Sequence, residues 1–128
     1  MNLSVEFTQD DKEIKSVLLD PEIYERISDD TCPEAHQIIN LPEDAVYIAG
    51  YWGNQIIGLF ILHQWRDAWL LHFQVLKDYR VTHSREFLTE CLKICDNVKI
   101  YAKIPTCYQS VINFARKFGF FNLESYRS

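Results

Sequence analysis

Residues 104–121, IPTCYQSVINFARKFGFF, describe a helix together with both of its ends. Thr106 and Gln109 have the spacing of a capping box, in which each side chain bonds the backbone N–H of the other residue. Gly119 then supplies the left-handed residue that ends many helices. Strand-like runs at 98–104 and 120–126 flank this stretch. One-turn spacing of apolar residues predicts a buried helix face, formed by Val111, Ile112, Ala115 and Phe118.

This strand–helix–strand unit resembles the C-terminal motif of the GCN5-related N-acetyltransferase (GNAT) superfamily. That motif reads roughly Asn, Ala-Ile, an apolar residue, then Tyr-Glu-Lys-Leu-Gly-Phe. The residues that fall in register with it are Ile112, Phe114, Lys117, Phe118, Gly119 and Phe120. The family's Asn falls on Tyr108, and its usual catalytic Tyr falls on Ala115. The resemblance implies an α+β fold with αβα layers, in which helices flank a mixed, mainly antiparallel GNAT-like sheet.

The composition indicates one domain spanning residues 1–128, and it excludes several classes of protein. A formal net charge of −5 argues against nucleic-acid binding, because no basic face is available. The longest apolar run, residues 56–62, is too short to span a membrane, and no signal peptide is visible. The four cysteines form no CxxC pair, so we interpret them as reduced thiols of a cytoplasmic protein.

The order of the predicted elements agrees with the GNAT fold. A strand at 3–7 precedes a helix opened by Thr8 and Asp11, and Pro21 begins a second short helix. Residues 28–44 are expected to form a connector. Strands at 45–52 and 55–65 are joined by Gly53-Asn54, a pair suited to a two-residue hairpin. A strand at 68–76, a loop at 77–85 and a helix through Cys95 complete the order.

In the superfamily the loop before that last helix carries Gln or Arg, then x-x-Gly-x-Gly or Ala, and holds the pyrophosphate of coenzyme A. Here Val81, His83 and Arg85 stand where glycines would be expected. Charged side chains can substitute for close backbone contact with phosphate, and Thr82 or Ser84 can cap the helix or bind an oxygen. The alternative is a structural helix N-terminus with solvated basic residues. The resemblance implies acetyl-CoA as cofactor, bound by Val75, Leu76, Lys77, Arg80, Val81, Thr82, His83, Ser84 and Arg85.

Candidate catalytic groups lie on the strand at 68–76 and at the start of the terminal helix. Alternation predicts that His72 shares a sheet face with Leu70, Gln74 and Leu76. The family often places a carboxylate base near here, whereas this strand holds no acid. His72 can deprotonate an ammonium group, and His63 on the preceding strand is a second candidate. The alternative for His72 is a half-buried histidine bonded to a neighbour.

Tyr108 is the candidate general acid for the departing thiolate, since Ala115 cannot donate a proton. Its alternative role is packing. No spacing of Cys, His and acids matches a zinc site, so no metal is expected. Cys91 and Cys95 fall on one helical face as core residues, and Cys107 is interpreted as a structural thiol.

Two functions remain open. The first is an acyl-CoA-dependent N-acetyltransferase that acts on a small-molecule or protein amine. The second is a catalytically degenerate GNAT-fold protein that acts through protein contacts, for example in tailed-phage virion assembly. The lost loop glycines and Ala115 favour the second, and aromatic residues such as Trp52 and Trp69 offer a possible interface, including one between copies of the chain. Neither alternative involves a membrane or nucleic acid.

Overall fold

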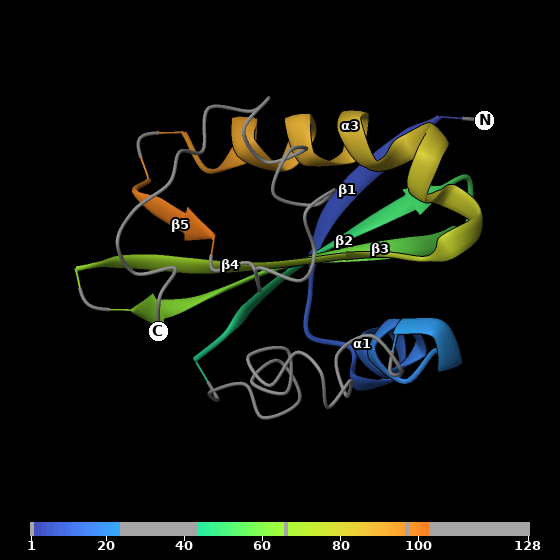
Figure 1. Ribbon diagram of the computed structural model, residues 1–128, viewed down its shortest axis with the longest axis horizontal. Helices are drawn as coiled ribbons and strands as arrows, with labels where there is room; N and C mark the ends of the chain where they lie inside the picture. The colour runs from blue at the N-terminus through green and yellow to red at the C-terminus, as the bar shows by residue number, and fades with distance from the viewer. Residues whose placement is uncertain (1, 24–43, 66, 97, 103–128) are drawn as a thin grey trace.

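The computed structural model describes residues 2–23, 44–65, 67–96 and 98–102. In chain order its elements are β1 (Leu3–Thr8), α1 (Asp11–Leu18), β2 (Val46–Trp52), β3 (Gln55–Trp65), β4 (Ala68–Val75), α3 (Lys77–Ile94) and β5 (Ile100–Ala102) (Figure 1). Residues 21–23 are helical, as expected from Pro21. The terminal helix predicted at 104–121 and nearly all of the connector predicted at 28–44 lie outside the described residues.

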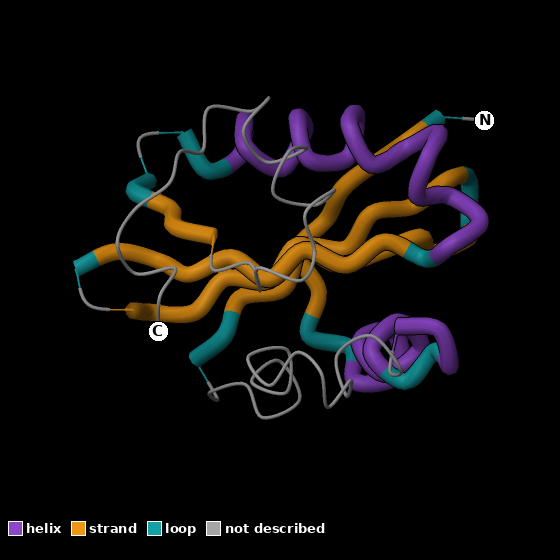
Figure 2. Tube along the Cα trace, viewed as in Figure 1, coloured by secondary structure: helices purple, strands orange, loops and turns teal. Residues whose placement is uncertain are grey.

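The strands form one sheet in the order β1-β2-β3-β4-β5. The first three pairings are antiparallel and the last, between β4 and β5, is parallel. The two helices lie on opposite faces of this sheet, α3 on one and α1 on the other (Figure 2). The predicted αβα arrangement with a mixed, mainly antiparallel sheet is therefore confirmed.

The β2–β3 hairpin has the predicted two-residue loop. Trp52 pairs with Gln55 across it, and Gly53 adopts a positive φ of 62°. Most side chains resist that backbone conformation, which explains a glycine at the first loop position. The sequence signal for this turn was thus sufficient to fix the pairing of the two central strands.

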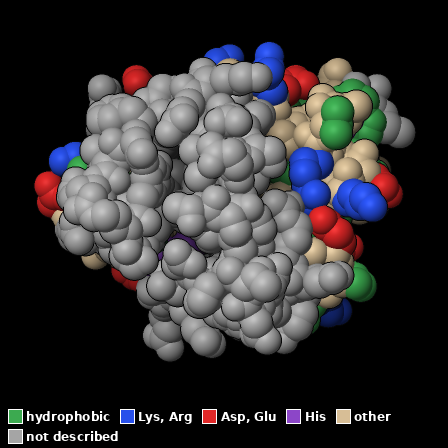
Figure 3. Space-filling model, viewed as in Figure 1, with side chains coloured by type: hydrophobic (Ala, Val, Ile, Leu, Met, Phe, Trp, Pro, Cys, Tyr) green, Lys and Arg blue, Asp and Glu red, His purple; other side chains and the backbone are tan. Residues whose placement is uncertain are grey.

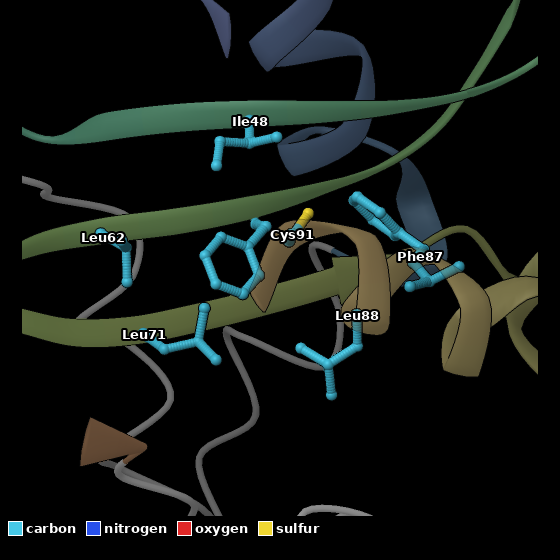
Figure 4. Packing of buried hydrophobic residues seen from close by; sticks show 8 residues of the cluster. Ile48, Leu62, Leu71, Phe87, Leu88 and Cys91 are labelled. Carbon is cyan, nitrogen blue, oxygen red and sulfur yellow. The ribbon is translucent and has the colours of Figure 1, made fainter. Parts of the chain in front are cut away.

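The larger core lies between the sheet and α3 (Figure 4). Phe87, Leu88 and Cys91 of α3 point towards buried residues of three strands, and the core consists of Ile48, Phe60, Leu62, Leu71, Val75, Phe87, Leu88 and Cys91. Burial raises the pKa of the Cys91 thiol. Cys91 is therefore the core residue that its helical spacing predicted, and its thiol is held in the protonated, unreactive form. No helix in the described part of the chain is long and apolar enough to cross a membrane.

Two glycines allow α3 to approach the sheet closely. Gly50 and Gly58 pair across β2 and β3, beneath the ring of Phe87. A Cβ at Gly50 would lie 2.8 Å from the Phe87 ring, and one at Gly58 would lie 2.4 Å from the backbone oxygen of Gln74. Side chains at these positions would push the helix or β4 away, so the glycines fix the spacing between the layers.

The smaller core lies on the α1 face, where Val17 packs with Ala49, Leu59 and Ile61. The expected opening of α1 by Thr8 is wrong in detail, because the Asp10 side chain accepts the capping hydrogen bond from the Lys12 N–H. The Thr8 hydroxyl instead donates to the Glu13 carboxylate, which also accepts from the Tyr51 hydroxyl at 2.6 Å. These two bonds attach the first turn of α1 to β1 and β2.

Candidate active site

His72 lies in the middle of β4 on the face that α1 covers. It pairs in register with Ile61, and Gln74 pairs with Leu59, both of which belong to the α1-side core. The predicted shared face of Leu70, His72 and Gln74 is consistent with this register. His63, which pairs with Leu70, also falls on this face. The two candidate histidines are therefore diagonal neighbours on adjacent strands.

The two imidazoles meet end to end. Their Nε2 atoms lie 2.9 Å apart, while the ring centroids lie 5.0 Å apart and the planes differ by 11°. The difference between these two distances is close to twice the distance from an imidazole centre to its nitrogen. Both nitrogens must then lie nearly on the line that joins the centroids, so the rings are not stacked face to face. This is the geometry of a direct N–H···N hydrogen bond.

Burial lowers the pKa of His72 to about 4, and the neighbouring His63 contributes to the same shift. Desolvation disfavours the charged form of an imidazole, so His72 is neutral near pH 7 and can accept a proton. The alternative reading, a half-buried histidine bonded to a neighbour, describes the same contacts. The arrangement itself is compatible with both roles.

β4 is paired with β3 along its whole length on one side and with β5 over only part of its length on the other. β5 pairs with it only at residues 69–71 within the described part of the chain, whereas β3 pairs with it from Ala68 to Val75. Beyond Val75, Leu76 donates its N–H to the carbonyl of Ile57 and acts as the N-cap of α3. Among the described residues no side chain caps this helix, although the Tyr79 N–H already donates to the Leu76 carbonyl. The N–H groups of Lys77 and Asp78 are those that could bind an anion at such a helix start.

The loop predicted at residues 77–85 is wrong, because α3 begins at Lys77. Thr82 and Ser84 lie inside the helix and cap nothing. The physical reason is in the sequence, since residues 77–94 contain neither glycine nor proline. The backbone N–H groups of residues 81–85 are directed along the helix and cannot surround a phosphate.

Arg80 is also not the solvated basic residue of the structural alternative. Its guanidinium donates to both carboxylate oxygens of Glu22, at 3.0 and 2.5 Å, and to the Val75 carbonyl at 3.0 and 3.3 Å. Both side chains of the ion pair are half-buried. Through these hydrogen bonds Arg80 connects the end of β4 and the start of α3 with the segment after α1.

The remaining predicted cofactor residues on α3 differ in exposure, according to the face of the helix on which they lie. Lys77, Val81, Thr82 and Arg85 are exposed, and Val81 is 96% exposed. Ser84 is buried, and its Oγ has no hydrogen-bond partner among the described residues. His83 packs against Trp52, with ring centroids 4.3 Å apart. Lys and Arg side chains lie beside Asp and Glu side chains where α3 begins (Figure 3). The start of α3 therefore has exposed cations, but acidic side chains lie among them and the surface is not uniformly basic.

Several candidates remain untested or were missed. Tyr108 and Cys107 lie outside the described residues. No group of three metal-ligating side chains is found within residues 2–23, 44–65, 67–96 and 98–102. Glu22 was missed because its partner Arg80 is 58 residues away in the sequence, and such a pair leaves no local pattern. The contact of His63 with His72 was also missed, although a tight turn after Trp65 would have placed them diagonally.

No protein-family model matches the chain, and no curated protein matches it. Several solved structures are similar to this chain. A ribosomal-protein-alanine N-acetyltransferase from Brucella melitensis biovar Abortus 2308 has a TM-score of 0.68 at 12% identity, over 96% of this chain and 94% of that one. A GNAT family acetyltransferase from Elizabethkingia anophelis, solved with acetyl-CoA bound, has a TM-score of 0.65 at 12% identity, over 96% and 78%. AAC(6')-Iy, solved with a bisubstrate analogue of CoA, has a TM-score of 0.66 at 10% identity, over 97% and 94%. At such identities the similarity establishes the fold.

Proposed function

This chain has the fold of the GNAT acetyltransferases, and we propose that it transfers an acyl group, such as acetyl, from coenzyme A to an amine. The observation that carries the proposal is His72, a half-buried base that is neutral near pH 7 and lies on β4, the strand that leads into α3. A proton acceptor can deprotonate the amine, and a helix start can bind the phosphates of coenzyme A.

The residues present fit coenzyme A in part. The first turn of α3 offers uncapped N–H groups and the exposed Lys77, which suit a diphosphate. Val75 and Leu76, at the end of β4, are the proposed contacts of the pantetheine arm. Residues 81–85 do not fit as a backbone cradle, because they are helical. Arg85 can contribute charge from the exposed face, and we assign Arg80 a positioning role through the Val75 carbonyl.

His72 takes a proton from the acceptor ammonium and leaves a free amine to attack the thioester carbonyl. His72 is unprotonated near pH 7 and can accept this proton, whereas its lowered pKa makes it a weaker base than a free imidazole. Tyr108 remains the proposed proton donor to the departing thiolate. The acceptor is an amine, carried either by a small molecule or by a protein.

The test is release of free coenzyme A thiol from acetyl-CoA in the presence of a panel of amines. We expect turnover by the parent protein and at least about a hundredfold loss of kcat in His72→Gln, the lower end of what one acid–base group contributes. The matched control is Lys93→Ala, which removes an exposed residue in the last turn of α3. Equal turnover by His72→Gln and the parent protein would rule out His72 as the base.

A second candidate function is a non-catalytic GNAT-fold protein that acts through protein contacts, as in virion assembly. The observation that favours it is the helical 80–85 segment, in which Arg80 already holds a carboxylate partner in Glu22. Absence of turnover together with absence of acetyl-CoA binding would support this candidate over the first.

A further inference from the structure

The contact between His63 and His72 holds a single proton. At an Nε2–Nε2 distance of 2.9 Å, two bare lone pairs would repel and two N–H groups would collide. One nitrogen must therefore donate and the other accept. The His63 Nδ1 atom lies 3.2 Å from the carbonyl of Gln64, which can only accept a hydrogen bond. His63 thus carries its proton on Nδ1 and accepts at Nε2, while His72 donates from Nε2.

This tautomer leaves Nδ1 of His72 as the basic atom of the contact. No hydrogen-bond partner for that atom lies among the described residues. Protonation there would make the Nε2–H of His72 a charged donor, and hydrogen bonds to charged groups are shorter and stronger than neutral ones. His63 would then stabilise the first positive charge in the contact, although it opposes a second.

We propose that His63 and His72 act as one proton-sharing base, in which His63 positions His72 and takes part of its charge. In the proposed acyl transfer, the N–H bond of the acceptor ammonium breaks and its electron pair stays on nitrogen. A new bond forms between that proton and Nδ1 of His72, and the Nε2 proton moves along the hydrogen bond towards His63. The role of the amine rests on the proposed function, whereas the sharing of a proton does not.

The titratable groups of the neighbouring elements do not compete with His63 for the shared proton of His72. From β2 the titratable group on the same face is Tyr47, and from β5 it is Tyr101, which pairs in register with Leu70. On α1 the carboxylate of Glu13 already accepts from Thr8 and Tyr51. Lys99, which lies near Tyr101, pairs with Asp67. The pKa of His72 is lowered first by burial and then by His63, as expected where two imidazoles in contact resist a second positive charge. Histidine atoms also reach the surface on the face drawn in Figure 3.

The test is an NMR titration of the histidine ring nitrogens in the full chain, without acetyl-CoA. For a shared proton, we expect the first protonation step to shift the nitrogens of both rings, followed by a separate second step. Titration of each ring in its own step, with the other ring unaffected, would overturn the proposal. Because this readout needs no substrate, it stays decisive even if the acyltransferase activity is absent.

Two variants show whether His63 raises or lowers the pH at which His72 takes up its proton. In His63→Ala, His72 loses its acceptor, and we expect it to take up its proton about one pH unit below the first step of the parent pair. In His63→Gln, an amide oxygen can accept the same hydrogen bond and should restore part of that difference. Protonation of His72 in His63→Ala at or above the first step of the parent would overturn the proposal. If acyl transfer is found, the acidic limb of its pH profile should move by the same amount.

Discussion

The guanidinium of Arg80 forms a two-point ion pair with the carboxylate of Glu22, with N–O distances of 3.0 and 2.5 Å. The same guanidinium donates to the Val75 carbonyl, at the last residue of β4. One side chain therefore connects the segment after α1, the end of β4 and the first turn of α3. Because β4 carries His72 and α3 carries Lys77, this ion pair helps to position the elements that hold the proposed site residues.

Removal of this ion pair should lower the stability of the fold. Arg80→Ala loses the pair and the bonds to Val75, and we expect the free energy of unfolding to fall by about 1–3 kcal/mol, as for hydrogen bonds to charged groups. Lys93→Ala is the control, because its ion pair with Glu90 is exposed and should contribute less than about 0.5 kcal/mol. Urea denaturation at neutral pH measures both. Equal stability of the two variants would show that the Arg80 pair is not structural.

Stability should also fall in mild acid because of His72. Its pKa is lowered from 6.5 to about 4 by burial and by His63. Between these values the unfolded chain binds a proton that the folded chain does not, so the stability present above pH 6.5 is lost as the pH falls towards 4. The loss amounts to roughly 3 kcal/mol.

Denaturation of the parent protein and His72→Gln at pH 7 and pH 4 isolates this contribution. Glutamine does not titrate, so the variant should lose less stability than the parent between the two pH values. Identical losses in the two proteins would contradict a lowered pKa for His72.

Gly58→Ala should be more destabilising than Gly50→Ala. The added Cβ at position 58 meets the backbone oxygen of Gln74, whereas the one at position 50 meets only the Phe87 ring. A side chain can move and a paired strand cannot, so we expect a loss of about 3 kcal/mol or more at 58 and about 1–2 kcal/mol at 50. Thermal or urea denaturation gives both values.

A double-mutant cycle with Phe87→Leu separates the two causes. The smaller side chain should relieve much of the penalty of Gly50→Ala and little of that of Gly58→Ala. Equal relief at both positions would show that the distance between β3 and β4 does not limit residue 58.

Lys77→Ala should weaken acetyl-CoA binding, because Lys77 is the exposed cation in the first turn of α3. Loss of a charged contact to phosphate predicts a decrease of about tenfold or more, since such contacts contribute about 1.5–3 kcal/mol. Arg85 lies two turns further along the helix, so Arg85→Ala should have a smaller effect. Titration calorimetry compares the two, and a larger loss in Arg85→Ala would place the diphosphate away from the helix start.

Most of the sheet could be predicted from the sequence because its signals are local. Gly53-Asn54 fixed one hairpin, and the alternation around His72 predicted which residues share a face. The error at residues 77–85 arose where the family pattern was preferred over local propensity. A segment without glycine or proline forms a helix there, and its cations are consequently spread over the helix faces.

The long-range contacts of the site could not be predicted in the same way. The Arg80–Glu22 pair depends on how the segment after α1 packs against β4, and this packing leaves no periodic pattern in either segment. The His63–His72 contact could be predicted in part. Its strands were predicted, but the register that makes the residues diagonal neighbours depends on the turn between Trp65 and Ala68.

Titration calorimetry of the full chain with acetyl-CoA is the most direct test of the proposed function. We predict saturable binding in the micromolar range, about −8 kcal/mol, retained in Lys93→Ala and weakened in Lys77→Ala. A thermal-shift scan alongside confirms that each protein is folded. Absence of binding up to millimolar acetyl-CoA by a folded parent protein would contradict an acyltransferase and favour a protein that acts through contacts.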